Sequence, residues 1–389
     1  MPPLGIYVQV PFCQTKCTYC NFHTGVVASS RFAPYADAVC TEIRQHRALY
    51  AAAGLPVVDA LSTLTVDSVY IGGGTPSLLD PAHIANMLRA MRATFAWSLP
   101  EITLEADPET IDPQKAASWA AAGVNRVSFG LQSFVDKELI AAGRMHRRAD
   151  IFRAVPILRQ AGIHNISFDL IAGLAHQTAD SWRQSLDELA NLQPEHVSVY
   201  LLEIDEGSRL GLEVLQGGSR YSARDIPPED QMADFYETAQ QHLQAAGYHH
   251  YEISNWARPG FESRHNLKYW RREAYLGFGA GAHSFVAGNR WANVHDAAAY
   301  VEAVEKSRLP VEQHEVLSSE RALEEELFLG LRQLDGIDVA KIEHAYGVQL
   351  APRFDPLANL GLLERRGNVV RLAPRKLSVS NEVFVELMR

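Results

Sequence analysis

The segment Ile6-Tyr-Val-Gln-Val-Pro-Phe-Cys13-Gln-Thr-Lys-Cys17-Thr-Tyr-Cys20 joins an apolar run to three cysteines on the short stretch that follows it. Thiolates on one short loop can converge on a single metal centre. Three of them can bind three irons of a cubane [4Fe–4S] cluster and leave the fourth iron without a protein ligand. We therefore expect Cys13, Cys17 and Cys20 to hold such a cluster. The remaining cysteine, Cys40, falls in a helical pattern and is expected to stay apart.

Other interpretations of these cysteines compete with the cluster. A structural zinc site usually closes with four Cys or His ligands, and His23 could be the fourth. Disulfides need an oxidising compartment, whereas the N-terminus has no secretory pattern and a reducing cytosol keeps thiols free. Three unrelated buried thiols are a poor match for Cys-x3-Cys-x2-Cys on an expected surface loop. The cluster is the leading interpretation, with zinc as the alternative.

Short β-rich runs alternate with helical patterns along the first half of the chain. Repeated βα units predict parallel strands with right-handed crossovers, and six of them suit an incomplete barrel. Several of the helices open on Pro, Asp or Thr and close near Gly. The expected strands are residues 6–10, 68–71, 101–105, 126–130, 165–171 and 196–202, and the expected helices are residues 32–53, 81–95, 113–122, 150–161 and 178–192.

Polar and glycine-rich positions follow these strands at the same end. Ligands of parallel α/β folds collect at the carboxyl ends of the strands, so these positions should line one mouth. The Gly72-Gly-Gly-Thr75 turn could instead serve only to reverse the chain. In strand order, the positions are the cysteine loop, Gly72 to Thr75, Glu105, Gln132, Asp169 and Glu203.

The cysteine spacing, with Tyr19 before the last cysteine, resembles the signature of radical S-adenosylmethionine (SAM) enzymes. In that family SAM binds the open iron, and its reductive cleavage gives a 5′-deoxyadenosyl radical. Tyr7-Val-Gln-Val-Pro-Phe-Cys13 and Gly72-Gly-Gly-Thr-Pro-Ser77 narrow the resemblance to the group containing oxygen-independent coproporphyrinogen III oxidase and the haem chaperone HemW. The resemblance implies an α/β fold with an incomplete (β/α)6 radical SAM barrel.

The same resemblance implies which residues contact SAM. Most of these residues lie at the strand ends described above. Tyr7 matches a tyrosine that contacts SAM in the family, and Tyr19 is assigned to the same SAM-contacting set. Three others match positions that contact a second SAM in the oxidase, and whether one or two molecules bind is left open. The first set is Tyr7, Tyr19, Gly73, Gly74, Thr75 and Glu105, and the second is Gln132, Arg144 and Asp169.

We expect residues 1–230 to form the barrel, residues 231–310 to connect, and residues 311–389 to form a smaller helical, winged-helix-like domain. Residues 207–228 are expected to be a loop over the mouth, or a mobile surface excursion. In the connecting region, His265-Asn266-Leu-Lys-Tyr269-Trp270 matches the His-Asn-x-x-Tyr-Trp motif associated with haem binding in HemW. His265 is the preferred haem ligand, with His250 and His283 in reserve. A hydrogen-bonded core role for His265 remains the alternative.

Two departures bear on the choice between the relatives. The oxidase has a cysteine where this chain has Phe22, and a histidine where it has Gln9, although that histidine is also usual in HemW. We therefore expect a HemW-like protein that binds haem and transfers it to acceptor haemoproteins. The first alternative is the oxidase, which decarboxylates coproporphyrinogen III oxidatively. The second is a radical enzyme that acts on another small molecule, so whether the chain is an enzyme is left open.

Composition limits the partners. The formal net charge of −10 argues against nucleic acid, although the basic stretch Arg144 to Arg148 is a local exception. Hydrophobic content of 47% with 21% charged residues is ordinary for a globular protein. No apolar run approaches the ~20 residues needed to span a bilayer, so a cytoplasmic protein is expected. Besides haem and its acceptors, an electron donor is an expected partner, and a homodimer is left open.

Overall fold

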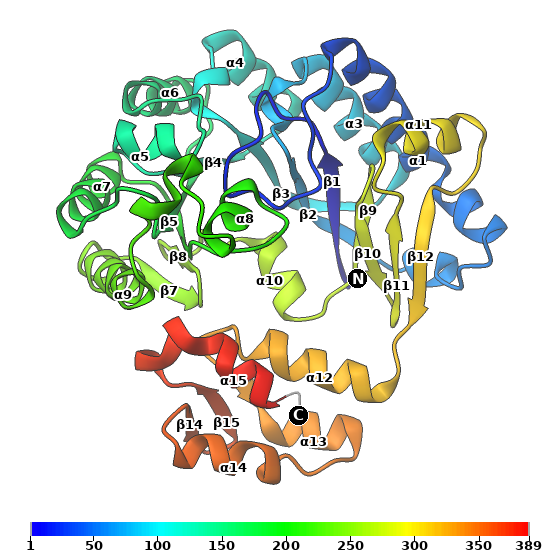
Figure 1. Ribbon diagram of the computed structural model, residues 1–389. Helices are drawn as coiled ribbons and strands as arrows, with labels where there is room; N and C mark the ends of the chain where they lie inside the picture. The colour runs from blue at the N-terminus through cyan, green and yellow to red at the C-terminus, as the bar shows by residue number, and fades with distance from the viewer. Residues whose placement is uncertain (1, 388–389) are drawn as a thin grey trace.

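The computed structural model describes residues 2–387, and six parallel strands form the centre of the molecule (Figure 1). Each strand pairs in parallel with the next, in chain order. All six expected strands are confirmed, most of them one to three residues longer at an end than predicted. They are β1 (Pro3–Val10), β2 (Thr65–Gly73), β3 (Trp97–Ala106), β4 (Arg126–Gln132), β5 (Asn165–Ala172) and β6 (His196–Leu201).

Helices cover the outer face of these strands and form a ring around them in Figure 1. Local capping explains several of their starts: Asp80 accepts from the Ala82 amide, and Asp112 accepts from the Lys115 amide ahead of Pro113. The principal helices are α1 (Phe32–Ala52), α3 (Pro81–Thr94), α4 (Pro113–Ala122), α6 (Arg148–Gln160), α7 (Ala179–Leu192) and α9 (Glu229–Ala245). Shorter ones are α2 (Val58–Leu61), α5 (Asp136–Ala141) and α11 (Ala297–Glu305).

The sheet continues beyond both ends of the parallel set, which sequence patterns did not predict. A parallel strand adds to β1, three antiparallel strands follow it, and two more lie beyond β6. The order is β12-β11-β10-β9-β1-β2-β3-β4-β5-β6-β8-β7, so within residues 2–387 the sheet stays open rather than closing into a barrel. The added strands are β7 (His249–Glu252), β8 (Asn255–Ala257), β9 (Tyr275–Phe278), β10 (His283–Val286), β11 (Asn289–Asn293) and β12 (Val311–Val316).

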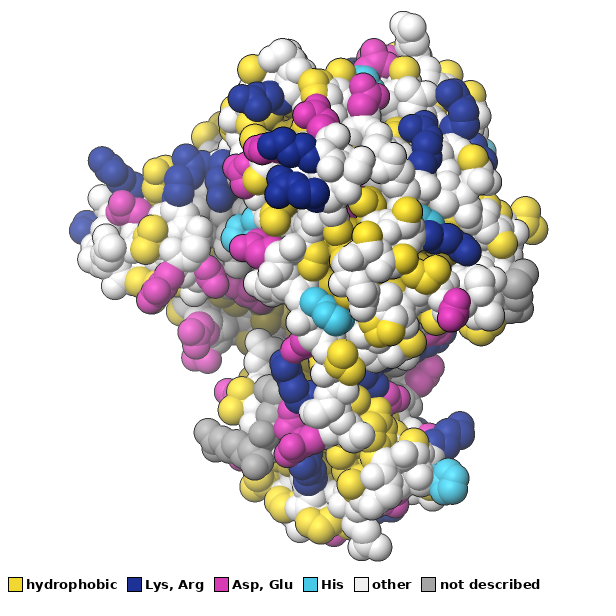
Figure 2. Space-filling view, turned by 90° about the vertical axis from the view of Figure 1, so that its right-hand side faces the viewer, with side chains coloured by type: hydrophobic (Ala, Val, Ile, Leu, Met, Phe, Trp, Pro, Cys, Tyr) yellow, Lys and Arg dark blue, Asp and Glu magenta, His cyan; other side chains and the backbone are white. Residues whose placement is uncertain are grey.

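The C-terminal part is a separate lobe below the sheet, and a constriction separates the two in the space-filling view (Figure 2). Its helices pack on a small sheet of order β13-β15-β14, and Phe328 and Phe384 meet edge to face in its interior. The helical C-terminal region that the sequence predicts is present, and it also contains a hairpin. Its elements are α12 (Ser319–Gly330), β13 (Ile337–Asp338), α13 (Val339–Tyr346), α14 (Ala351–Asn359), β14 (Leu363–Arg366), β15 (Val369–Leu372) and α15 (Ser380–Leu387).

Residues 207–228 are not only a loop, and that part of the expectation was wrong. Ser208 caps a short helix, α8 (Arg209–Leu215), by accepting from the Gly211 amide. The Leu210 amide donates to the Thr18 carbonyl at 2.8 Å, so α8 lies against the cysteine loop. The segment therefore packs on the outside of the cysteine loop, and its role as a cover of the mouth stays a prediction. Across the described chain, none of the helices is both long and apolar enough to cross a membrane.

Candidate functional site

The cysteine loop leaves the carboxyl end of β1 and is fixed at two points. The Cys13 amide donates to the Gly25 carbonyl at 3.0 Å, and the Thr18 amide donates to the Ala142 carbonyl at 3.0 Å. Cys13, Cys17 and Cys20 are free, half-buried thiols that line one cavity of about 170 Å³. Cys40 lies on α1, 3% exposed, in the hydrophobic core. The structure thus brings three cysteines together and keeps the fourth apart.

These donors suit a polynuclear cluster better than one ion. A cubane takes each thiolate on a different iron, so its three sulfurs need not meet at one point. Among residues 2–387, no three His, Cys, Asp or Glu side chains converge as a single metal ion would require. His23, the fourth ligand that zinc would need, instead lies against the His295 ring. Arg144 Nη1 donates to Cys17 Sγ at 3.2 Å, which suits a thiolate.

The glycines at the end of β2 approach the cysteine loop closely. The Gly74 amide donates to the Val10 carbonyl at 2.8 Å, and the Thr75 amide donates to the Phe12 carbonyl at 2.6 Å. A Cβ on Gly74 would overlap the Phe12 backbone. Gly73 has a φ of 113°, in the region that favours glycine. These glycines therefore do more than turn the chain: they let the second strand end touch the loop that carries the cysteines.

Glu105 lies at the end of β3 and faces the same cavity. Tyr70 Oη donates to its Oε1 at 2.8 Å, and the Gly73 amide donates to its Oε2 at 2.8 Å. Burial raises the pKa of Glu105 to about 7, against the opposing effect of these two donors. Each carboxylate oxygen can accept more than one hydrogen bond, so Glu105 retains capacity for a ligand hydroxyl or amino group.

The other predicted SAM residues meet around the same space. Arg144 forms an ion pair with Asp107 and donates from Nη2 to the Gly130 carbonyl at 2.8 Å. The Gln132 side-chain oxygen is buried without a partner, and burial raises the pKa of Asp169 to about 6. Sequence reasoning missed Asp107, although a second acidic residue just past Glu105 was a usable signal.

Tyr7 lies behind these residues, stacked on the Tyr70 ring that donates to Glu105, rather than on the cavity wall. Its hydroxyl donates to Gln9 Oε1 at 2.6 Å, and Tyr7 is not among the residues that line either of the cavities next to the cysteines. The Gln9 side chain, at the position where the two relatives usually have a histidine, lies over Gly73: a Cβ on Gly73 would come within 2.6 Å of Gln9 Nε2. Gln9 therefore links Tyr7 to the glycine turn.

His265 is a core residue at the other end of β1. Its ring is 1% exposed, with Nδ1 at 3.1 Å from Ser68 Oγ and Nε2 at 2.8 Å from Tyr269 Oη. Burial, helped by the Lys268 charge, lowers the pKa of His265 to about 3. Both nitrogens have partners, so binding an iron here would require opening this packing. Haem ligation by His265 stays a prediction, and the geometry matches its hydrogen-bonded alternative. The motif residues lie on α10 (Arg264–Trp270).

The reserve histidines differ from each other. The His250 ring stacks on Trp256 with centroids 3.9 Å apart, and its Nε2 lies 3.2 Å from the Ile253 carbonyl oxygen. His283, at the start of β10, is exposed. Of the three histidines considered as haem ligands, His283 is therefore the one with an accessible ring.

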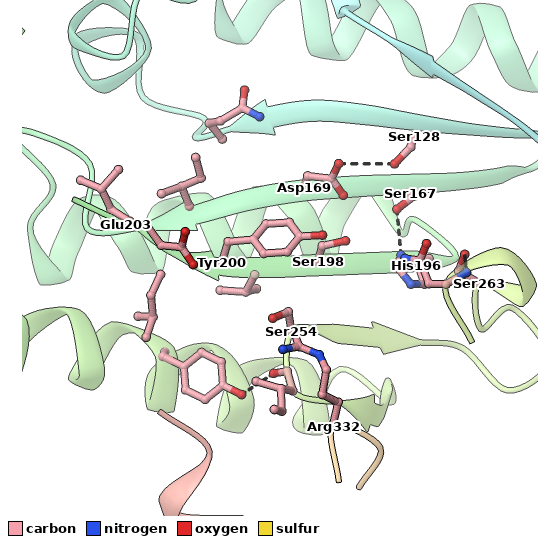
Figure 3. A pocket seen from close by; sticks show the side chains of 18 of the residues that line it. Ser128, Ser167, Asp169, His196, Ser198, Tyr200, Glu203, Ser254, Ser263 and Arg332 are labelled. Carbon is pink, nitrogen blue, oxygen red and sulfur yellow. Dashed lines mark hydrogen bonds between the residues drawn. The ribbon is translucent and has the colours of Figure 1, made fainter. Parts of the chain in front are cut away.

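A larger cavity of about 540 Å³ runs from the cysteine loop toward the C-terminal lobe (Figure 3). Figure 3 shows Asp169, Ser198 and Tyr200 on neighbouring strands beside it, with Arg332 at the opposite wall. Residues from both ends of the chain close it, including Cys20 and Asn381. Sequence reasoning named Asp169 and Glu203 here but missed Ser128, Ser167 and Ser198, whose signal is a polar residue inside a buried strand.

Comparisons with known proteins agree with this geometry. The family model of the radical SAM superfamily matches residues 7–189, and that of the HemN C-terminal domain matches residues 317–377. Coproporphyrinogen III oxidase (HemN) from Escherichia coli has the same fold, with a TM-score of 0.82, 23% identity, and coverage of 99% of this chain and 90% of that one.

Curated relatives are similar over nearly the whole chain. The haem chaperone HemW of Bacillus subtilis is 34% identical over 384 residues, 97% of each chain. HemW of Mycobacterium tuberculosis is 33% identical over 99% of this chain and 95% of its own, and HemW of Escherichia coli is 35% identical over 74% and 71%. Membership of the radical SAM superfamily implies a [4Fe–4S] cluster and SAM as cofactors. The chain belongs to this superfamily and, within it, to the family of the curated HemW proteins.

Proposed function

We propose that this protein is a radical SAM [4Fe–4S] protein that binds haem and transfers it to acceptor haemoproteins. The observation that carries the proposal is the similarity to haem chaperones over 97% of both chains. The oxidase alternative is not favoured, because the likeness to HemN is 23% identical and concerns the fold. Phe22, 67% exposed, also stands where the oxidase has a further cysteine.

Cys13, Cys17 and Cys20 would hold the cluster, since their thiols share one cavity. When bound, the cluster supplies an electron to SAM at an iron that carries no protein ligand. Arg144 would stabilise the Cys17 thiolate through its hydrogen bond to Sγ. Half-buried Asp107 in turn holds the Arg144 guanidinium in place.

Gly73, Gly74, Thr75 and Glu105 would bind SAM, because they line the cavity beside the cysteines. Glu105 would accept a hydrogen bond from an amino or ribose hydroxyl group, in addition to those from Tyr70 and Gly73. Tyr19 lines the same cavity, whereas Tyr7 would act through Gln9. Gln132, Arg144 and Asp169 continue the polar wall and would take a second SAM, if two bind.

Three further features belong to the proposal. The protein would work in the cytoplasm, take its electron from a separate donor, and release haem to an acceptor protein. Residues 1–230 would act as the cofactor-binding barrel, with residues 231–310 connecting it to the C-terminal residues 311–389. Whether two copies associate would be decided by sedimentation, which measures mass independently of cofactor content.

The test is anaerobic reconstitution followed by three parallel measurements. Saturable haem uptake, a SAM-dependent change in the spectrum of the reduced cluster, and haem transfer to an apo-haemoprotein are expected. Conversion of coproporphyrinogen III is expected to be absent. Efficient conversion without saturable haem binding would replace the chaperone proposal by the oxidase.

A further inference from the structure

The motif helix α10 lies between the sheet and the C-terminal lobe (Figure 1). Toward the sheet, His265 Nδ1 lies 3.1 Å from Ser68 Oγ of β2. Toward the lobe, the Arg332 guanidinium, just after α12, covers the Trp270 ring with its carbon 4.4 Å from the ring centroid. The Trp270 indole nitrogen is buried there and has no hydrogen-bond partner among the described residues. The helix that carries the motif is therefore held on both sides.

Two arginines tie this region to α12 of the lobe. Arg290, on β11, pairs through both terminal nitrogens of its guanidinium with Glu325, with Nη1 at 2.6 Å from Oε1 and Nη2 at 2.9 Å from Oε2. Arg272, two residues after α10, pairs with the same carboxylate and with Glu326, where Nη1 lies 3.0 Å from Oε2. Bidentate pairs of this kind are among the stronger ionic contacts in proteins. We call Arg272, Arg290, Glu325 and Glu326 the ionic latch.

Backbone hydrogen bonds attach the lobe beside the ionic latch. The Ile253 amide donates to the Arg332 carbonyl at 3.1 Å, and the Leu334 amide donates to the Tyr251 carbonyl at 3.1 Å. These two bonds join the chain after α12 to β7 and the residue that follows it. Interfaces between domains that depend on polar contacts usually allow relative motion, and salt weakens their ion pairs. The backbone bonds would therefore act as a pivot when the ionic latch opens.

Arg272 connects the ionic latch to the motif itself. Its φ is 51°, in the region that favours glycine, and a non-glycine residue persists there only where surrounding contacts fix it. Its amide donates to the Tyr269 carbonyl at 3.1 Å, at the end of α10. Tyr269 Oη in turn lies 2.8 Å from His265 Nε2, which it keeps occupied. Loss of the ion pairs on Arg272 would thus loosen the residue that blocks one nitrogen of the motif histidine.

We propose that the C-terminal lobe is a gate over the motif helix, and that haem reaches α10 only after the ionic latch opens. The inference rests on the proposed function and adds its control. In the closed state both ring nitrogens of His265 have partners and Arg332 covers Trp270. In the open state Arg332 leaves the Trp270 ring, and Tyr269 releases His265 Nε2 for the iron. Because only open molecules bind haem, the apparent affinity and the uptake rate scale with the open fraction.

The experiment compares the reconstituted wild type with the double variant Glu325→Gln/Glu326→Gln and with the control Glu324→Gln. Glutamine keeps the shape of the side chain and removes its charge. Glu324 lies on the same helix but, within the described chain, forms no ion pair with Arg272 or Arg290. Hydrogen exchange before haem is added measures how often α10 opens, and stopped-flow absorbance measures the rate of haem uptake.

The double variant is expected to exchange at least about threefold faster over residues 264–272, with unchanged exchange in β4 and β5. Its haem uptake should accelerate by about the same factor, because the open fraction sets both rates. Raising the ionic strength from about 0.05 M to about 0.5 M should speed uptake by the wild type and by Glu324→Gln, and should leave the double variant nearly unchanged. Iron and sulfide content should be equal in all three proteins.

Two outcomes would overturn the gate and leave the chaperone function standing. Equal exchange over residues 264–272 in the double variant and the wild type would show that the ionic latch does not hold α10. Faster exchange with an unchanged rate of haem uptake would show that haem binds without this opening. A wild type that takes up no haem would instead remove the proposed function, and the exchange measurement, made without haem, would still show whether the ionic latch holds α10.

Discussion

The two ends of β1 offer histidines in opposite states. At the amino end, His265 lies against Gly5, buried, with a partner on each nitrogen. At the carboxyl end, His23 and His295 lie against each other, and within residues 2–387 their ring nitrogens have no hydrogen-bond partner. The histidine in the recognisable motif thus has both ring nitrogens hydrogen-bonded. The two histidines without such partners lie outside any recognisable motif. A motif shows that a histidine is needed, and its packing shows whether a nitrogen is free.

The same contrast holds for other polar groups. At the amino end, Lys268 is 2% exposed and pairs with both Asp67 and Glu273. At the carboxyl end, three thiols and the buried Gln132 oxygen face a cavity. Unpartnered buried groups are costly, by about 1–3 kcal/mol each, so they persist where something else uses them. At the carboxyl end such groups face a cavity that a ligand could fill, whereas the Lys268 charge at the amino end is already paired.

The largest effect is expected for the cysteines that follow the carboxyl end of β1. Cys17→Ala should abolish the cluster, because two thiolates leave a second iron without a protein ligand. Cys40→Ala is the matched control, since Cys40 is 3% exposed in the core, and its iron and sulfide content should equal the wild type. Metal and sulfide analysis after anaerobic reconstitution measures both. A cluster kept in Cys17→Ala and lost in Cys40→Ala would reverse the assignment.

At the amino end of β1, His265→Ala should destabilise the fold. It leaves a cavity between Tyr7 and Tyr70 and takes the partner from Ser68, which together should cost about 2–4 kcal/mol. Chemical denaturation measures the loss in unfolding free energy, provided that its slope against denaturant concentration is the same in the variant and the wild type. Exposed His164→Ala should stay within about 0.5 kcal/mol of the wild type. A fully stable His265→Ala protein would mean that the histidine is kept for a ligand, and would favour the motif as the haem site.

At the carboxyl end of the parallel strands, Glu105→Ala should weaken SAM binding. A hydrogen bond to a charged group is worth about 1.5–3 kcal/mol, so a loss of about tenfold or more is expected. The change of the reduced-cluster spectrum on SAM titration gives the affinity. Glu302→Ala is a suitable control because that carboxylate is exposed on α11 and pairs with Lys306, four residues further along the chain. Equal SAM affinities in Glu105→Ala and the wild type would remove Glu105 from the site.

Local signals explain which parts of the fold were predictable. The six parallel strands are apolar and buried, and helices such as α3 and α4 begin at Asp-Pro pairs, so neighbouring residues specify both. Strands β9 and β10 have four residues each, and β9 pairs with β1 from the far part of the chain. Such short strands depend on distant partners and carry no period of their own.

The site divides in the same way. Cys13, Cys17 and Cys20 were predictable because they share one loop, and Glu105 because it ends a strand. The hydrogen bonding of His265 could not be read from the sequence, because it depends on Ser68 from β2, a contact made only in the folded chain. The pairing of His23 with His295 was hidden for the same reason: a loop residue meets one that follows β11.

The smallest expected effect concerns Glu42, a buried carboxylate near the carboxyl end of β1. It accepts from the Gly279 amide at 3.0 Å, Asn293 at 2.8 Å and Tyr300 Oη at 2.5 Å, and so fixes the turn that precedes His283. Burial nevertheless raises its pKa to about 7, above the ordinary value near 4.5. A raised carboxyl pKa favours the folded state at low pH, and this stability is lost as pH rises through about 7.

Stability should therefore fall between pH 6.5 and 8, with about 0.5–1 kcal/mol of the fall due to Glu42. The window lies above the ordinary histidine pKa. Buried histidines such as His46, whose pKa burial lowers to about 4, contribute the opposite trend only below it. Glu42→Gln should lose this share of the slope, whereas Glu302→Gln should keep it. Parallel pH profiles for Glu42→Gln and the wild type, measured by denaturation, would show that the carboxyl titrates normally and that its three donors outweigh its burial.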